Sequence, residues 1–295
     1  MNKLAILAMT QKGFEVVRAV FEAAPSLVEC VVSARDRSVS DDFFDEIREY
    51  CDDNSIPFHS RHPPESCAAN YAFAVSWRWM INSFPGTVIV FHDSLLPKYR
   101  GFNPLVTALI QGDAQVGVTA LYASKNYDCG PIIRQRRLDV TYPVKIQHAI
   151  EIVAQASRDL AVQLARDLEA GRTPHGVEQD ESAATYSLWR DEDDYWIDWR
   201  GDAGSIRRKI DAVGRPYAGA ATLLGGRTVR ILEAEEAVDV VIANRDPGKV
   251  IFVEDGAPVV VCGEGLLRIR RIQDEQGATL LPLRRFRSRF RAPTA

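Results

Sequence analysis

Apolar runs alternate with amphipathic stretches through the first half of the chain. Residues 3–8 and 27–33 are mostly apolar and are typical of buried strands, and residues 14–24 between them have the apolar spacing of a helix. A strand–helix–strand opening predicts a parallel, Rossmann-like sheet. The same pattern predicts further strands at 71–76, 87–91, 117–124 and 132–140, and helices at 104–111 and 144–170.

The second half of the chain has a different pattern of apolar and turn-forming residues. From residue 221 to 272, short strands alternate with glycine turns, which predicts a small β-barrel of the OB-like type. We therefore expect an α/β domain over 1–180, a connector over 181–220, and an OB-like barrel domain with a basic tail over 221–295. The tail interleaves arginine with phenylalanine, and we interpret it as a frayed terminus and not as a nucleic-acid-binding tract.

Composition narrows the class of protein. The 295 residues are 46% hydrophobic and 26% charged, which suits two globular domains, and the net charge of −4 gives no nucleic-acid footprint. No apolar run approaches the ~18 residues of a membrane-spanning helix. The five cysteines lack CxxC spacing, and His59 and His62 lack a third ligand. We expect a cytoplasmic protein with reduced thiols and no metal site.

One histidine stands where chemistry is expected. His92 follows the predicted strand 87–91, and ligands of open α/β sheets bind outside the carboxyl ends of strands. Asp128 lies in a loop after strand 117–124, and a carboxylate beside an imidazole favours the charged ring and can orient it. Taken alone, His92 is as compatible with a half-buried structural histidine, and Asp128 with a turn aspartate. The residues by themselves indicate an acid/base site of unknown chemistry.

The surroundings of His92 form a more specific pattern. After His92 come Ser94-Leu95-Leu96-Pro97 and then Arg100-Gly101; Asp128 and Gly130 follow, at a separation of 128 − 92 = 36. This series resembles the formyltransferases that use 10-formyltetrahydrofolate. The resemblance implies that an amine attacks the formyl carbon, that His92 assists proton transfer and stabilises the oxyanion, and that Asp128 orients His92 and raises its basicity.

The resemblance also implies two sets of binding residues. Large aromatic side chains are equally at home in a core, so we expect one of the tryptophans near residue 77 to pack inside. The folate cosubstrate is expected to contact Trp77, Arg78, Met80, Ile81, Ser94, Leu95, Tyr127 and Asp128. The acceptor is expected to contact Lys12, Lys98, Tyr99, Arg100, Gly101, Phe102 and Asn103.

The chain departs from the family pattern two residues before His92. The family has asparagine there, which helps to hold the formyl oxygen, whereas this chain has Val90. Valine cannot donate a hydrogen bond, and the loss of one oxyanion donor costs ~2.7–4 kcal/mol. Asn103, in the following loop, is a candidate replacement.

The acceptor predicted by the sequence is a nucleotide-linked amino sugar, such as a dTDP-amino-dideoxyhexose used in O-antigen or polysaccharide biosynthesis. Residues 41–53 are rich in acids, where tRNA-modifying relatives carry a basic insertion, and acids repel a phosphate backbone. Methionyl-tRNA formyltransferase is the alternative. A formyl-folate hydrolase, or a homologue that binds ligand with weak turnover because of Val90, also stays open, as does a homodimer.

Overall fold

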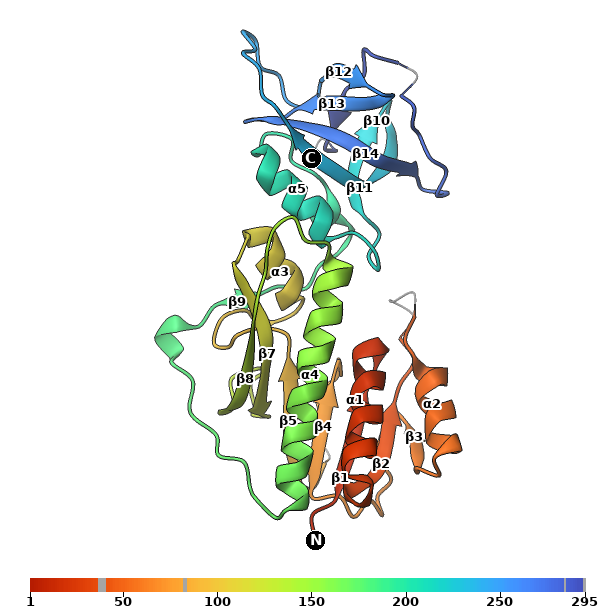
Figure 1. The fold of residues 1–295 in the computed structure, drawn as a ribbon, viewed down its shortest axis with the longest axis vertical. Coiled ribbons are helices and arrows are strands. Elements are labelled where there is room, and N and C mark those ends of the chain that lie inside the picture. The colour runs from red at the N-terminus through yellow and green to blue at the C-terminus, as the bar shows by residue number, and fades with distance from the viewer. Residues whose placement is uncertain (37–40, 82–83, 284, 294–295) are drawn as a thin grey trace. The chain divides into compact units, whose positions relative to one another are not determined.

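The computed structural model describes residues 1–36, 41–81, 84–283 and 285–293 (Figure 1). The chain divides into two compact units. The first comprises Met1–Leu105, Gln115–Asp139 and Ala149–Leu188, and the second comprises Val106–Ala114, Val140–His148 and Trp189–Ala295. The expected connector, 181–220, is therefore shared between the two units, with its first residues in the α/β unit.

The first unit is built on a seven-stranded sheet in the order β3-β2-β1-β4-β5-β7-β8. The first five strands in this order are parallel, whereas β7 runs antiparallel to both β5 and β8. This confirms the predicted α/β class with a mostly parallel sheet. The strands are β1 (Leu4–Ala8), β2 (Val28–Ser33), β3 (Phe58–Ser60), β4 (Tyr71–Val75), β5 (Thr87–His92), β7 (Gln115–Tyr122) and β8 (Ile132–Asp139).

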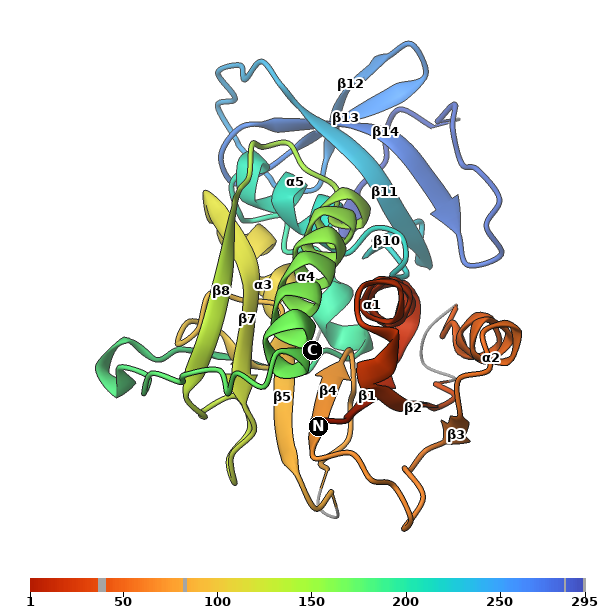
Figure 2. The ribbon, with the colours of Figure 1, turned by 60° about the horizontal axis from the view of Figure 1, so that its bottom comes forward.

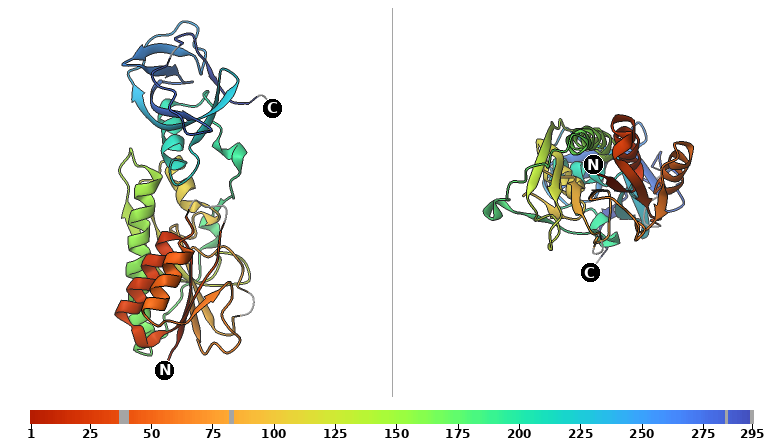
Figure 3. Two further views of the ribbon diagram at one scale, coloured as in Figure 1. Left: turned by 90° about the vertical axis from the view of Figure 1, so that its right-hand side faces the viewer. Right: turned by 90° about the horizontal axis from the view of Figure 1, so that it is seen from below.

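Helices α1 and α4 cover one face of this sheet (Figures 1, 2 and 3). The first begins at Thr10, earlier than the predicted residue 14, because the polar residues before Phe14 form its first turn and conceal the apolar pattern. Among the described residues, no helix is long and apolar enough to cross a membrane. The helices of this unit are α1 (Thr10–Ala23), α2 (Phe44–Asp53) and α4 (Ile146–Glu169), with a 3-10 turn at Pro25–Leu27. Most of α3 (Pro104–Gln111) belongs to the second unit.

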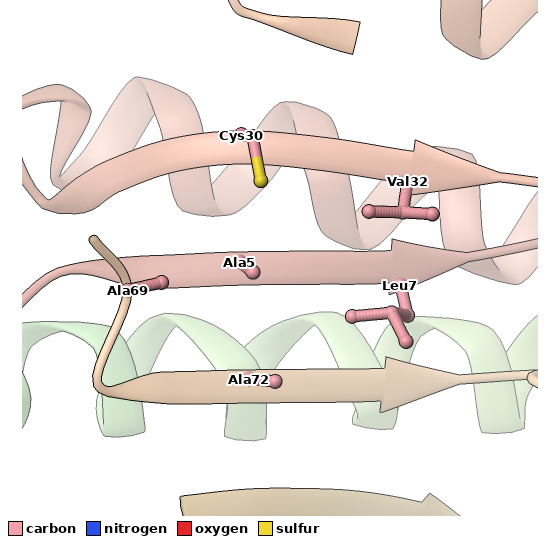
Figure 4. Close-up of a cluster of buried hydrophobic side chains, with 6 residues drawn as sticks. All are labelled: Ala5, Leu7, Cys30, Val32, Ala69 and Ala72. Atoms are coloured by element: carbon pink, nitrogen blue, oxygen red, sulfur yellow. The ribbon is translucent and has the colours of Figure 1, made fainter. Parts of the chain in front are cut away.

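A loop covers the opposite face of the sheet. Small side chains such as Ala5 and Ala72 line that face, and Figure 4 shows them with the helix ribbons behind the strands. Trp77, Ile81 and Phe84, all from the segment after β4, pack against this cluster. Small strand residues leave the room that large loop side chains fill, because protein interiors are close-packed. Residues 77–81 are thereby held over the sheet.

The second unit contains a curled antiparallel sheet in the order β12-β13-β14-β11-β10-β15. A bridge between Lys249 and Arg289 joins its two ends, so the predicted barrel is confirmed. Helix α5 (Ala203–Ala212) and 3-10 turns at Glu181–Ala183 and Glu192–Tyr195 occupy the expected connector. The strands are β10 (Ala220–Leu224), β11 (Arg227–Ala237), β12 (Val250–Glu254), β13 (Ala257–Val261), β14 (Leu266–Asp274) and β15 (Phe290–Arg291).

The basic tail is partly structured, so the expectation of a frayed terminus is wrong at β15. Phe290 is buried and its ring lies 5.5 Å from that of Trp199. Burial of an aromatic side chain supplies enough apolar area to order a short strand at the edge of the barrel. Arg284, which belongs to the same basic tail, lies outside the described residues.

Candidate active site

His92 is the last residue of β5, the strand that lies between β4 and β7. It pairs with Thr119 of β7 and is only 7% exposed. Side chains alternate between the two faces of a strand, so His92 shares a face with Val90. That face is the one covered by the segment after β4, since Val88, two residues before Val90, packs against the same cluster. The fold therefore presents the imidazole at the carboxyl end of the sheet, on its loop-covered face.

Each ring nitrogen of His92 faces an oxygen. Nε2 lies 2.8 Å from the carbonyl oxygen of Tyr99, and Nδ1 lies 3.5 Å from Oδ1 of Asp128. A carbonyl oxygen can only accept, so Nε2 carries a hydrogen and the neutral ring has its lone pair on Nδ1. Nδ1 is therefore the nitrogen that can take up a proton. Once charged, the ring donates toward both oxygens.

Asp128 is held in place by its loop. Its backbone is left-handed, with φ +57°, and its Oδ2 accepts a hydrogen bond of 2.9 Å from the Gly101 N–H. Gly101 has φ +101°, and a Cβ there would meet the Ser187 carbonyl oxygen at 2.6 Å. Only glycine fits this position without displacing the neighbouring chain. The glycine of the Arg-Gly pair thus allows the contact that anchors Asp128.

Backbone strain gathers around this site. The described non-glycine residues with positive φ include Thr10, Arg61, Ser76, Tyr99, Asn103 and Asp128, all at or near the carboxyl edge of the sheet. Each such residue costs of order 1–3 kcal/mol and persists only where its surroundings hold it. Thr10 and Ser76, which follow β1 and β4, are joined by a hydroxyl–hydroxyl hydrogen bond of 3.1 Å. This concentration of strain supports a functional role for the edge.

Lys12 lies in the first turn of α1 and reaches the loop after His92. Its ammonium nitrogen is 2.6 and 2.8 Å from the two carboxylate oxygens of Asp93. The side chain of Lys12 is almost completely buried. The expected acceptor contact of Lys12 is thus taken by an internal ion pair that braces the residue next to His92.

Arg100 was expected to contact the acceptor, and its placement contradicts this. The residue is 0% exposed, and its guanidinium donates to Oε1 of Gln179 and to both carboxylate oxygens of Glu181. Hydrogen bonding to Glu181 raises the pKa of Arg100, so the group stays charged. Its charge is balanced inside the protein by Glu181, and this pairing holds the polar segment that precedes β9 (Tyr186–Ser187).

Ser94 and Leu95 are also engaged within the protein. The Ser94 hydroxyl donates to the Lys98 carbonyl at 2.6 Å, which closes the turn after His92. Leu95 packs so closely on Gly117 of β7 that a Cβ there would lie 2.5 Å from it. Their side chains therefore shape the loop, and a ligand contact from this turn would come from its backbone.

The segment after β4 offers an apolar surface. Trp77 packs into the core, whereas Trp79 is 41% exposed and Met80 is 59% exposed. The two indole rings meet edge to face, 5.2 Å apart, and Arg78 is paired with Asp36 at 2.7 Å. One tryptophan thus packs inside, as expected. Exposed aromatic and thioether groups on a fixed segment suit a flat heterocyclic ring such as a pterin.

A second aromatic surface lies beside Asp128. Phe102 and Tyr127 are each about half exposed, and their ring centroids are 6.2 Å apart. Lys98 lies over the ring of Tyr99, which is itself buried. Asn103 is partly exposed, and its side chain makes no hydrogen bond within the described part of the chain. Phe102, Tyr127 and Asn103 are thus available to an incoming molecule.

Sequence reasoning missed the residues that hold these loops together. Parallel strands β6 (Arg100–Gly101) and β9 pair, and the Tyr99 N–H donates to the Thr185 hydroxyl at 2.9 Å. The Phe102 N–H donates to the Ser187 carbonyl at 2.9 Å. Residues 171–186 are turn-rich and polar, and polar composition alone does not indicate that a segment will add a strand to the loop beside His92.

A cavity of about 400 Å³ lies elsewhere in the first unit, between β8 and α4. Its lining is rich in arginine and glutamine and contains none of the candidate residues. The lining residues are Arg134, Gln135, Arg136, Asp159, Leu160, Val162, Gln163 and Arg166.

The fold is shared with known proteins. A crystal structure of the N-formyltransferase from Helicobacter canadensis, in complex with folinic acid and dTDP-3-aminofucose, superposes with a TM-score of 0.70 at 16% identity. The match covers 91% of this chain and 98% of that one. At this identity the likeness concerns the fold.

Sequence comparison identifies the family. Family models described as "Formyl transferase" and "Formyl transferase, C-terminal domain" match residues 63–164 and 190–288. The methionyl-tRNA formyltransferase of Carboxydothermus hydrogenoformans is 30% identical over 201 residues, which cover 68% of this chain but only 64% of that relative. That of Anaeromyxobacter dehalogenans strain 2CP-C is 31% identical over 215 residues, 71% of this chain and 68% of that relative. The chain belongs to the formyl transferase family.

Proposed function

We propose that this protein transfers a formyl group from 10-formyltetrahydrofolate to an amine. The observation that carries the proposal is the arrangement of His92, whose Nδ1 faces the Asp128 carboxylate at 3.5 Å while Nε2 is held by the Tyr99 carbonyl. An imidazole with one nitrogen fixed and the other beside a carboxylate can accept a proton and stabilise the resulting charge. Membership of the formyl transferase family supplies the reaction.

The cosubstrate brings an activated formyl group, whose oxygen gains negative charge when an amine attacks its carbon. The segment carrying Trp79 and Met80 is the surface we propose for its pterin ring, since those side chains are exposed and their backbone is fixed over the sheet. Tyr127, next to Asp128, is the other exposed ring on this side of the site.

His92 and Asp128 then accept the proton of the attacking amine and stabilise the charges that form. His92 takes the amine proton on Nδ1, and Asp128 stabilises the charged ring that results. The charged ring in turn stabilises negative charge on the formyl oxygen. The ring then gives this proton to N10 of the folate as the bond between N10 and the formyl carbon breaks, which releases tetrahydrofolate and leaves the formamide. Val90, which shares the face of His92, offers no donor there. We propose as the replacement the amide of Asn103, which has no hydrogen-bond partner among the described residues.

For the acceptor we propose a nucleotide-linked amino sugar. Three observations support it over a tRNA. The exposed face of α2 is acidic, with Asp45 and Glu46 in its first turn. Many arginines of the barrel are paired with carboxylates, for example Arg270 with Glu235 and Arg245 with Asp239. The fold also matches, end to end, that of an N-formyltransferase crystallised with a dTDP-amino sugar.

Methionyl-tRNA is the second candidate acceptor, because the curated relatives at 30–31% identity carry that name. The two acceptors differ in their response to salt. A protein that neutralises six to ten phosphates loses roughly a thousandfold or more in affinity between 50 and 200 mM salt. A dTDP-sugar has a single diphosphate, so we expect a far smaller loss.

The acceptor is tested by incubating the purified protein with 10-formyltetrahydrofolate and a panel of dTDP- and UDP-amino sugars, with charged initiator tRNA in parallel. Mass spectrometry then reports a gain of one formyl group on either acceptor. We expect the gain on a nucleotide sugar, and we expect it to disappear in His92→Ala. Formylation of the tRNA alone would replace the sugar proposal with the tRNA one.

A further inference from the structure

One buried amide joins the two loops of the candidate active site. Gln179 is 9% exposed, and its Oε1 accepts hydrogen bonds of 3.1 and 2.8 Å from the Arg100 guanidinium. Its Nε2 donates to the carbonyl oxygens of Asp128 and Gly130, both at 2.8 Å. The side-chain amide thus uses both of its donors and both lone pairs of its oxygen.

These bonds act on the residues that anchor the carboxylate of Asp128. The carboxylate is held by the Gly101 N–H, and Gly101 follows Arg100 directly. The carbonyl of Asp128 belongs to a residue in the left-handed region, which needs an external contact to keep its conformation. Gln179 therefore fixes the backbone of Asp128 directly. Through Arg100 it also fixes Gly101, whose N–H holds the Asp128 carboxylate.

Arg100 is also connected to His92, through Tyr99. The carbonyl that fixes Nε2 belongs to Tyr99, which precedes Arg100, and the Arg100 N–H donates to the Thr185 carbonyl at 2.8 Å. A shift of Arg100 would consequently move the carbonyl that orients the imidazole as well as the amide that orients the carboxylate. The distance between His92 and Asp128 therefore depends on the position of Arg100, which Gln179 holds.

We propose that Gln179 is a positioning residue that sets Asp128 against His92. This inference rests on the proposed function of that pair. Gln179 does not touch the reacting atoms in this account; it acts through Arg100 and the Asp128 loop. A misplacement of about 1 Å in an active site can cost a hundredfold in rate, so the effect should be large relative to any loss of stability.

Two substitutions distinguish the hydrogen bonds that Gln179 accepts from Arg100 from those that it donates to the Asp128 loop. Gln179→Glu keeps an acceptor for Arg100 but loses the donor to the carbonyls of Asp128 and Gly130, whereas Gln179→Leu removes both. Gln163→Leu, on the exposed side of α4, is the matched control. Each variant is measured for kcat and KM of formyl transfer, for melting temperature, and for the ring ¹⁵N chemical shifts of His92 in the free protein.

We expect kcat to fall roughly ten- to a hundredfold in both Gln179 variants, with KM for the folate nearly unchanged. The His92 ring shifts should move in both, and neither quantity should change in Gln163→Leu. Should Gln179→Leu fail to fold, Gln179→Glu alone gives the same readouts. A fall in melting temperature with unchanged kcat and unchanged His92 shifts would overturn the inference, because it would reveal a merely structural role.

Failure of the proposed function has a different signature. A wild-type protein that formylates no acceptor would remove that function. The His92 ring shifts would still report on positioning, since they need no substrate. Shifts that are identical in wild type, Gln179→Glu and Gln179→Leu would then overturn the positioning role independently.

Discussion

The Nε2 of His92 lies 2.8 Å from the carbonyl oxygen of Tyr99, a residue whose backbone is in the left-handed region with φ +63°. The carbonyl fixes which nitrogen carries the hydrogen of the neutral ring. We predict that the neutral His92 is the Nε2–H tautomer, with the lone pair on Nδ1 facing Asp128. The ¹⁵N chemical shifts and couplings of His92, assigned by comparison with His92→Gln, check this at a pH where the ring is neutral. A predominant Nδ1–H tautomer would contradict it.

Asn103 gives a prediction about the missing oxyanion donor. If its free amide replaces the family's asparagine, Asn103→Ala lowers kcat by roughly a hundred- to a thousandfold, the cost of one oxyanion donor. Folate affinity, measured by titration calorimetry, should change little.

A second substitution tests the same idea in reverse. Val90→Asn restores a donor at the family position, on the face of β5 that also carries His92. In the Asn103→Ala background it should recover part of the lost kcat. Full activity of Asn103→Ala alone would exclude Asn103 as the donor.

The buried charge of Arg100 makes a prediction about stability. Arg100→Met leaves the buried Oε1 of Gln179 without its donors, which costs about 1–3 kcal/mol in the free energy of unfolding. Arg136→Met is the control, because Arg136 is exposed on β8 and its side chain makes no ion pair or hydrogen bond with a described residue; we expect it to stay within about 0.5 kcal/mol. Urea denaturation measures both variants. Equal stability of the two would contradict the support assigned to Arg100.

The cysteines should react in an order set by burial. Burial raises the pKa of Cys51 and of Cys262 to about 12, and the thiolate is the reactive form. In native protein at pH 8, iodoacetamide should therefore label the partly exposed Cys67 and Cys129 first. Peptide mass spectrometry reads the order, and labelling in urea is the control in which all five react. Early native labelling of Cys51 or Cys262 would contradict the packing around them.

The architecture and the proposed pair, His92 and Asp128, could be predicted from the sequence, but the residues that hold this pair in place could not. Strand 87–91 and His92 stand out because a buried strand reads as an apolar run and a polar residue ends it. Asp128 stands out only through its spacing. Gln179 and Thr185 lie in a polar segment whose partners are 51 to 86 positions away in the chain, and no local pattern encodes such contacts.

The burial of Arg100 could not be predicted from the sequence for the same reason. An arginine in an Arg-Gly loop near a candidate site suggests a role in binding anions, and nothing nearby in the sequence suggests burial. Its partners, Gln179 and Glu181, become neighbours only when the 179–187 segment folds back along β6. Tertiary pairing decided the role of this side chain, and residue type alone did not.

The central claim is that His92 and Asp128 move a formyl group from folate to an amine. The most direct measurement is the appearance of tetrahydrofolate from 10-formyltetrahydrofolate, followed with and without an amino-sugar acceptor, in wild type, His92→Ala and Asp128→Ala. We predict release that requires the acceptor and is lost in both variants. Acceptor-independent release would indicate a hydrolase, and release that survives in His92→Ala would contradict the account.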